Sequence, residues 1–143
     1  FENIKMSGVL TPIVINMWYN CCDPDRYTEY VWSREKFLVD ERTPRLGSFV
    51  FRNMDCEDCS VAACYCDGLP ESPIESVTME DITFTFREDA TPDKPAMMNF
   101  GKEFCRAGMY FDNVSHLTVK NVKMSGNIGD ELIAKNVEKV TKI

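Results

Sequence analysis

The chain has 143 residues, of which 44% are hydrophobic, and its formal net charge is −7. This length suffices for one core and requires no second domain, so we expect a single domain over 1–143. The acidic balance argues against a nucleic-acid partner, because polyanion binding rests on clustered Lys and Arg. No apolar run reaches the roughly 18 residues that a membrane span needs, so no membrane partner is expected.

A short motif recurs along the chain. Residues 1–8 read Phe-Glu-Asn-Ile-Lys-Met-Ser-Gly, and residues 119–126 read Val-Lys-Asn-Val-Lys-Met-Ser-Gly. Weaker copies place an Asn or Asp between apolar residues at Asn53, Asp81, Asn113 and Asn136. The Asn/Asp positions are separated by 50, 28, 32, 8 and 15 residues. Such irregular spacing excludes a helical repeat of fixed length and favours a strand solenoid with variable loops.

The motif predicts a corner between two short strands. Asn and Asp tolerate a left-handed backbone and bond to their own turn, which suits a corner that returns once in each coil. After the first copy, the apolar run at 13–17 is expected to form a second strand of the same coil.

Residues 20–47 interrupt this pattern as a long inserted loop. They show no period, and long loops in compact domains are commonly functional or disordered. Five aromatic residues in or beside the first half of the insert argue against disorder: Trp18, Tyr19, Tyr27, Tyr30 and Trp32.

Beyond the insert, strands are expected at 49–66, as a pair within 74–86, and in compact coils at 109–143. Ile82, Phe84 and Phe86 alternate with threonines, as in a half-buried strand. The polar loop at 87–94 is expected on the flank where strand solenoids commonly build a binding face. The sequence therefore predicts an all-β fold.

Seven cysteines are an odd number, so at least one thiol is outside any intrachain disulfide, which favours a reducing compartment. The pairs Cys56-x-x-Cys59 and Cys64-x-Cys66 have a metal-like spacing. However, the first pair would fall on opposite faces of a strand, and no histidine lies nearby. We expect buried or surface thiols, no metal site and no cofactor.

Three stretches carry a family resemblance: residues 1–8, the following 11–19, and Gly-Leu-Pro-Glu-Ser-Pro-Ile-Glu-Ser at 68–76. In this order, together with the aromatic loop, they resemble the C-terminal part of bacterial glycoside hydrolase family 28 proteins, the polygalacturonase-like group. The resemblance spans essentially the whole chain. It implies a right-handed, single-stranded parallel β-helix, with only the C-terminal coils present, and a parent enzyme that hydrolyses pectin-type polysaccharides with inversion.

Inverting hydrolysis needs a carboxylic acid and a carboxylate base on opposite faces of the glycosidic bond. The family supplies its machinery from Asn-Thr-Asp, Asp-Asp, Gly-His-Gly and Arg-Ile-Lys motifs, and none of the four occurs here. The single histidine, His116, has no glycine neighbour and is interpreted as a corner residue. In the family these motifs precede the matched region. We therefore expect no catalytic residue in this chain and no activity from the chain alone.

The resemblance implies one sugar-site residue, Tyr19, which follows the strand at 13–17. Trp18, Tyr30 and Trp32 are further candidates for substrate binding, because an aromatic face can carry a sugar ring. The alternative for Tyr19 is an ordinary aromatic at the loop base, and for the others it is anchoring of the loop. Basic residues of the insert could meet uronic acid carboxylates or pair with local acids: Arg26, Arg34, Lys36, Arg42 and Arg45.

Two functions remain open. The chain is either the C-terminal part of a polysaccharide hydrolase, forming one wall of the substrate cleft, or a non-catalytic carbohydrate-binding or scaffold β-helix that self-associates through its N-terminal coil. Because the chain opens inside a repeat unit without a cap, we expect a longer parent protein. The thiols favour the cytoplasm, whereas relatives in the family are often exported, so the sequence leaves the compartment open, as it does the sugar and the linkage.

Overall fold

A computed structural model describes residues 1–18, 33–95 and 101–143. Within these ranges the chain forms seven strands and no helix, and therefore no helix that is long and apolar enough to cross a membrane. The strands are β1 (Glu2–Ser7), β2 (Ile13–Asn16), β3 (Ser48–Cys59), β4 (Ala62–Asp67), β5 (Ile74–Phe86), β6 (Ala107–Ser125) and β7 (Leu132–Lys142).

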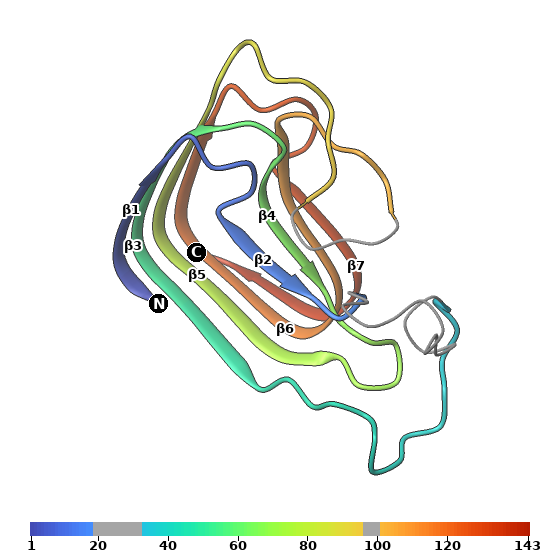
Figure 1. Cartoon of the computed structure of the whole chain (residues 1–143). Coiled ribbons are helices and arrows are strands. Elements are labelled where there is room, and N and C mark those ends of the chain that lie inside the picture. The colour runs from blue at the N-terminus through green and yellow to red at the C-terminus, as the bar shows by residue number, and fades with distance from the viewer. Residues whose placement is uncertain (19–32, 96–100) are drawn as a thin grey trace.

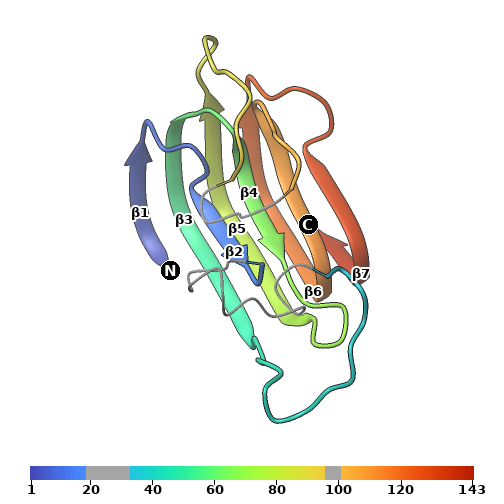
Figure 2. The same ribbon diagram turned by 45° about the vertical axis from the view of Figure 1, so that its right-hand side comes forward.

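The strands form one parallel sheet. Its order is β1-β3-β5-β6-β4-β2, and β7 also pairs with β6. The first part of β6 pairs with β4 and the later part pairs with β5. Strand β7 pairs with residues from both parts of β6. As a result the sheet curls, and β2 and β4 lie across the core from β3 and β5 (Figures 1 and 2). The prediction of an all-β chain is thus confirmed, with parallel strand pairing throughout the named strands.

The Asn and Asp residues of the repeat form the bends of these strands. All six have a left-handed backbone, with φ between 45° and 59°: Asn3, Asn53, Asp81, Asn113, Asn121 and Asn136. Their short polar side chains make this conformation less costly than it is for other L-residues. The sequence-based prediction of left-handed corners is confirmed.

The corners lie in two columns, and the expectation of one corner in each coil is wrong. Asn3, Asn53, Asp81 and Asn121 follow one another across β1, β3, β5 and β6, as the strand registers require. Asn113 and Asn136 form a second column on β6 and β7. The interval of 8 residues between Asn113 and Asn121 is therefore the distance between two bends of one long strand.

The core lies inside the curl and contains many sulfur atoms. Phe84 and Phe111 are fully buried, and alternation along β5 places Ile82, Phe84 and Phe86 inside as predicted. The expected strand pair at 74–86 is a single strand, bent at Asp81. Cysteine and methionine side chains from several strands complete the core: Met54, Cys56, Cys59, Cys64, Cys66, Met79 and Met109.

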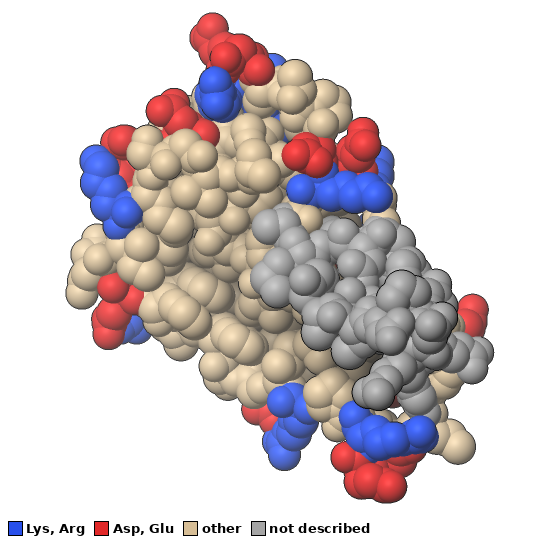
Figure 3. Space-filling model, viewed as in Figure 1, with Lys and Arg blue, Asp and Glu red and all other residues tan. Residues whose placement is uncertain are grey.

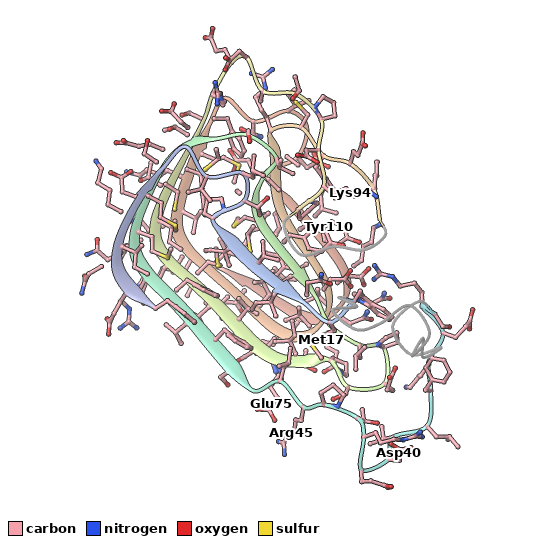
Figure 4. The ribbon with its side chains drawn as sticks, viewed as in Figure 1. Met17, Asp40, Arg45, Glu75, Lys94 and Tyr110 are labelled. Carbon is pink, nitrogen blue, oxygen red and sulfur yellow. The ribbon has the colours of Figure 1, made fainter. Side chains whose placement is uncertain are left out.

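The insert lies partly outside the described residues. Its described portion, 33–47, contains no strand, and β3 begins at Ser48 directly after it. Arg45 of this portion pairs with Glu75 of β5, and both side chains lie together at one end of the curled sheet in Figure 4. The end of the insert therefore lies beside the start of β5, and the chain then continues into β3.

Candidate binding groove

A groove of about 690 Å³ lies along β4, β6 and β7. Figure 4 marks its position by Tyr110, on the side of the molecule where these strands run. The groove is lined by aromatic, basic, amide and carboxylate side chains: Arg34, Tyr65, Lys102, Phe104, Tyr110, Asp112, Asn113, Lys135 and Asn136.

Two tyrosines form the floor of this groove. Tyr65 of β4 and Tyr110 of β6 are paired in the strand register, so their rings stack with centroids 4.9 Å apart and planes 5° apart. Phe104 packs against both rings, with centroid distances of 5.7 Å to Tyr65 and 5.8 Å to Tyr110. Tyr65 is only 4% exposed. One face of each tyrosine ring is therefore covered by the other tyrosine.

Each tyrosine hydroxyl donates to an aspartate two residues ahead on its own strand. The distance is 2.8 Å from Tyr65 to Asp67 and 3.1 Å from Tyr110 to Asp112. Alternate residues of a strand point to the same side, which makes this pairing possible. Burial raises the pKa of both tyrosine hydroxyls, and the neighbouring carboxylates raise it further. Both tyrosines are neutral hydrogen-bond donors at physiological pH.

Basic side chains surround this floor, although the protein as a whole is acidic. Lys135 lies 5.3 Å from the centroid of the Tyr110 ring and next to Asp112 in the strand register. Lys102 lines the groove from the segment before β6. Asn136 donates to Asp112 at 2.8 Å and so fixes the carboxylate that faces the groove. Such a set of donors favours a polar ligand with negative charge.

Asp112, which lines the groove, and the buried Asp67 beside it do not form a hydrolytic pair. Asp67 and Asp112 are neighbours in the register of β4 and β6, so both come from one side of the groove. Asp67 is fully buried and bonded to Arg34 and Tyr65. Inverting hydrolysis needs two carboxyl groups on opposite faces of the bond. The described residues of this groove hold no such arrangement.

The structure describes one of the four aromatic residues predicted to bind substrate. Trp18 is 1% exposed, and the guanidinium carbon of Arg34 lies 4.1 Å from its ring centroid. Tyr19, Tyr30 and Trp32 lie outside the described residues. Substrate binding by these four residues stays a prediction.

Most basic residues of the insert have an acidic partner. Arg34 pairs with Asp67, Arg42 with Asp40 two residues away, and Arg45 with Glu75 of β5. The pairing with Asp40 lowers the pKa of that carboxyl group, chiefly through its hydrogen bond with the Arg42 side chain. Arg26 lies outside the described residues.

His116 is not a corner residue, contrary to our sequence interpretation. It lies within β6, three residues after the bend at Asn113, and its side chain is exposed. Its Nδ1 atom lies 3.3 Å from the carbonyl oxygen of Glu75. The sequence offered a short polar stretch here, and the parallel register with β5 decided that the stretch is strand.

The strand-face argument for the cysteines was also wrong. Cys56 and Cys59 are both fully buried, because the register shifts between them and Asp58 has a φ of 55°. Burial raises the pKa of Cys56 to about 11 and that of Cys59 to about 12. Among the described residues, no group of three or more His, Cys, Asp or Glu side chains could hold a metal ion.

Of the groove residues, the sequence singled out Arg34 as a possible partner of uronic acid carboxylates and Asn113 and Asn136 as corners, but not the tyrosines, the lysines or Asp112. One signal was available: Tyr65-x-Asp67-Gly68 and Tyr110-x-Asp112-Asn113 share a Tyr-x-Asp pattern, each at the end of an apolar run. Asn113 donates to the carbonyl oxygen of Gly68 at 3.0 Å and so links the two copies. The Tyr-x-Asp repeat therefore lies at the groove, whereas the Asn/Asp repeat lies at the corners.

Comparisons with protein-family models, with curated proteins and with solved structures returned no significant match to this chain.

Proposed function

We propose that the chain is a section of a right-handed parallel β-helix from a polygalacturonase-like glycoside hydrolase, and that its groove binds an acidic, pectin-type polysaccharide. The groove along β4, β6 and β7 carries this proposal, because it gathers tyrosines, amides and two lysines, with Lys135 on β7 and Lys102 in the segment before β6. A uronic acid chain offers hydroxyl groups and carboxylates to such a lining. In this role the chain supplies one wall of a cleft and no catalytic acid or base.

The bent strands support the β-helix part of the proposal. β6 passes through two corners and pairs on different parts of its length with β4 and β5. β7 repeats the course of β6 in register, from Leu132 opposite Met109 to Lys142 opposite Val119. A parallel β-helix stacks its coils in this way, and variable loops leave between them.

The charge of the groove supports an acidic ligand. Lys102 and Lys135 line it, whereas the whole chain carries a formal charge of −7. Asp112 is the carboxylate on the lining, and it is already bonded to Tyr110 and Asn136. The local balance therefore attracts an anion, although the protein as a whole repels it.

We expect the chain to bind oligogalacturonate, with an affinity that falls as salt is raised, and to release no reducing sugar from it. Isothermal titration calorimetry measures the first property and a reducing-end assay the second. A fully methyl-esterified oligogalacturonate is the matched neutral ligand and should bind more weakly. Equal binding of both ligands would contradict the charge argument, and release of reducing ends would contradict the absence of a catalytic pair.

Variants of the lysines locate the binding site. Lys102→Gln combined with Lys135→Gln should weaken oligogalacturonate binding by about tenfold, as expected for two lost charge-assisted contacts near the surface. Lys123→Gln is the control, because Lys123 is exposed on β6 outside the groove. An equal loss in the control would mean that binding follows net charge and not the groove.

A second candidate, a scaffold that self-associates through its first coil, is favoured by the free strand edge at β1. Among the described strands, β1 pairs with β3 alone and β2 pairs with β4 alone. Figure 3 shows charged side chains around the rim of this face and a wide area without them at its centre. Unpaired edges with uncharged surroundings can pair with another chain.

Sedimentation velocity over a range of protein concentrations tests the second candidate. Met6→Lys places a charge on β1, and it should abolish any association that uses this edge. If the wild-type protein is a monomer at all concentrations, the scaffold function is contradicted. That result would not bear on the proposal that the groove binds a polysaccharide.

A further inference from the structure

The described part of the insert is attached to the sheet next to the groove through Arg34. The Nη1 atom of Arg34 lies 2.7 Å from Oδ2 of Asp67, at the end of β4. The same guanidinium lies over the Trp18 ring, with its carbon 4.1 Å from the ring centroid. One side chain thus joins the insert to the residues that follow β2 and to the end of β4.

The attachment point is buried and charged. Asp67 is fully buried, whereas the Arg34 side chain is 40% exposed. The Oδ2 atom of Asp67 also accepts the Tyr65 hydroxyl, and Oδ1 has no hydrogen-bond partner in the described structure. A buried carboxylate needs a counter-charge, and Arg34 is its ion-pair partner here.

The contact bears directly on the shape of the groove. Arg34 lines the groove together with Tyr65. Tyr65 in turn stacks on Tyr110, whose hydroxyl bonds to Asp112. A planar guanidinium can donate to a carboxylate and cover an aromatic ring at once, which a lysine ammonium does less well.

We propose that Arg34 is a positioning residue that holds the described part of the insert, which begins at residue 33, against the end of β4 and so fixes one wall of the groove. Its ion pair with Asp67 supplies the attachment, and its stacking on Trp18 sets the direction of the insert. Without Arg34 residues 33–43 lose their fixed place, while the end of the insert stays bound to β5 through the Arg45–Glu75 ion pair and the sheet keeps its fold at reduced stability. This role is independent of the ligand, so it is tested without one.

Limited trypsin digestion measures the attachment, because Lys36 offers a cleavage site two residues beyond Arg34. Arg34→Met keeps the length of the side chain and removes the ion pair. Cleavage after Lys36 should become about tenfold faster or more, since a hydrogen bond to a buried charge is lost. Arg42→Met is the matched control: it also removes one tryptic site, but its ion pair is with Asp40 inside the insert.

A second variant separates attachment from sheet stability. Arg34→Met leaves the Asp67 carboxylate buried without its ion-pair partner, which also destabilises the sheet. Adding Asp67→Asn removes this charge and should restore the urea midpoint, while cleavage after Lys36 stays fast. Arg34→Lys, which keeps a charge but no planar group, should give an intermediate cleavage rate.

Trp18 gives an independent readout. The protein has two tryptophans, so Trp32→Phe leaves Trp18 as the single fluorophore. In that background Arg34→Met should raise acrylamide quenching of Trp18 severalfold, because the side chain no longer bonds to Asp67 and is not held over the ring. The proposal is overturned if cleavage after Lys36 is no faster than in Arg42→Met, or if the double variant restores both the urea midpoint and the resistance to trypsin.

Discussion

Asn and Asp at the bends carry the residue-scale information of this fold. In the first column of bends, side-chain amides join neighbouring strands in two pairs: Asn53 donates to Asn3 at 2.6 Å, and Asn121 donates to Asp81 at 2.7 Å. Each residue therefore both adopts the left-handed backbone and bonds to the next strand. A hydrophobic residue at the same position could do neither at low cost.

Replacing Asn53 tests this dual role. Asn53→Ala should lower the free energy of unfolding by about 1–2 kcal/mol, because alanine resists a positive φ. Asn53→Gly should lower it less, since glycine adopts the conformation freely and loses only the amide contact. Urea denaturation measures both. An Ala variant as stable as the wild type would show that the bend does not depend on this residue.

At the scale of elements, β6 holds the sheet together. It pairs with β4, β5 and β7, and its start fits closely against the chain before β7. A Cβ atom on Gly108 would lie 2.4 Å from the carbonyl oxygens of both Asp130 and Glu131. Only the missing side chain permits the hydrogen bond of 2.8 Å from Met109 to Glu131 beside it.

Gly108→Ala should therefore destabilise the protein by about 1–3 kcal/mol or more, as a forced backbone displacement does. Gly47→Ala is the control, because its Cβ would meet only Glu75 Oε2 at an ordinary 3.7 Å. The control should change stability by less than about 0.5 kcal/mol. Thermal unfolding of the two variants gives the comparison, and equal changes would contradict the close approach at Gly108.

At the scale of the whole molecule, a charge ladder crosses the outer face of four strands. Its members alternate in sign across β1, β3, β5 and β6: Glu2, Arg52, Glu80 and Lys120. Glu80 lies at its centre, 2.6 Å from Lys120 and 2.8 Å from Arg52. These two contacts lower the pKa of the Glu80 carboxyl, with the Lys120 hydrogen bond as the largest cause.

The lowered pKa gives the sign of a pH effect. A carboxyl group that ionises more readily in the folded state stabilises that state above its unfolded pKa, near 4.5, and this contribution is lost as pH falls through the folded value. Glu80→Gln should therefore destabilise the protein at pH 7, and the difference from wild type should shrink below about pH 4. Glu138→Gln removes one negative charge at an exposed position on β7 and is the control for the change in net charge. The test compares the urea midpoints of the wild type and Glu80→Gln from pH 3 to pH 7. A difference between them that does not change with pH would contradict the stabilising role of the Glu80 carboxylate.

The sequence by itself determined the class of the fold and its corners. Apolar alternation predicted the strands, and the recurring Asn and Asp predicted left-handed bends, because both signals depend on neighbouring residues alone. The same local signals failed at Cys59 and His116. At Cys59 a register shift between β3 and β5 decided which way the side chain points, and at His116 pairing with β5 decided that the residue lies in a strand.

Only the tertiary structure decided the groove. Tyr65 and Tyr110 are 45 residues apart in the sequence, and the pairing of β4 with β6 brings their ring centroids to a distance of 4.9 Å. Arg34 and Asp67 are likewise far apart in sequence, and they meet because the insert returns beside the end of β4. Strand register and the path of the insert depend on residues that are far apart in the sequence. The Tyr-x-Asp repeat can therefore be read from the sequence, but the contacts that bring its two copies together cannot.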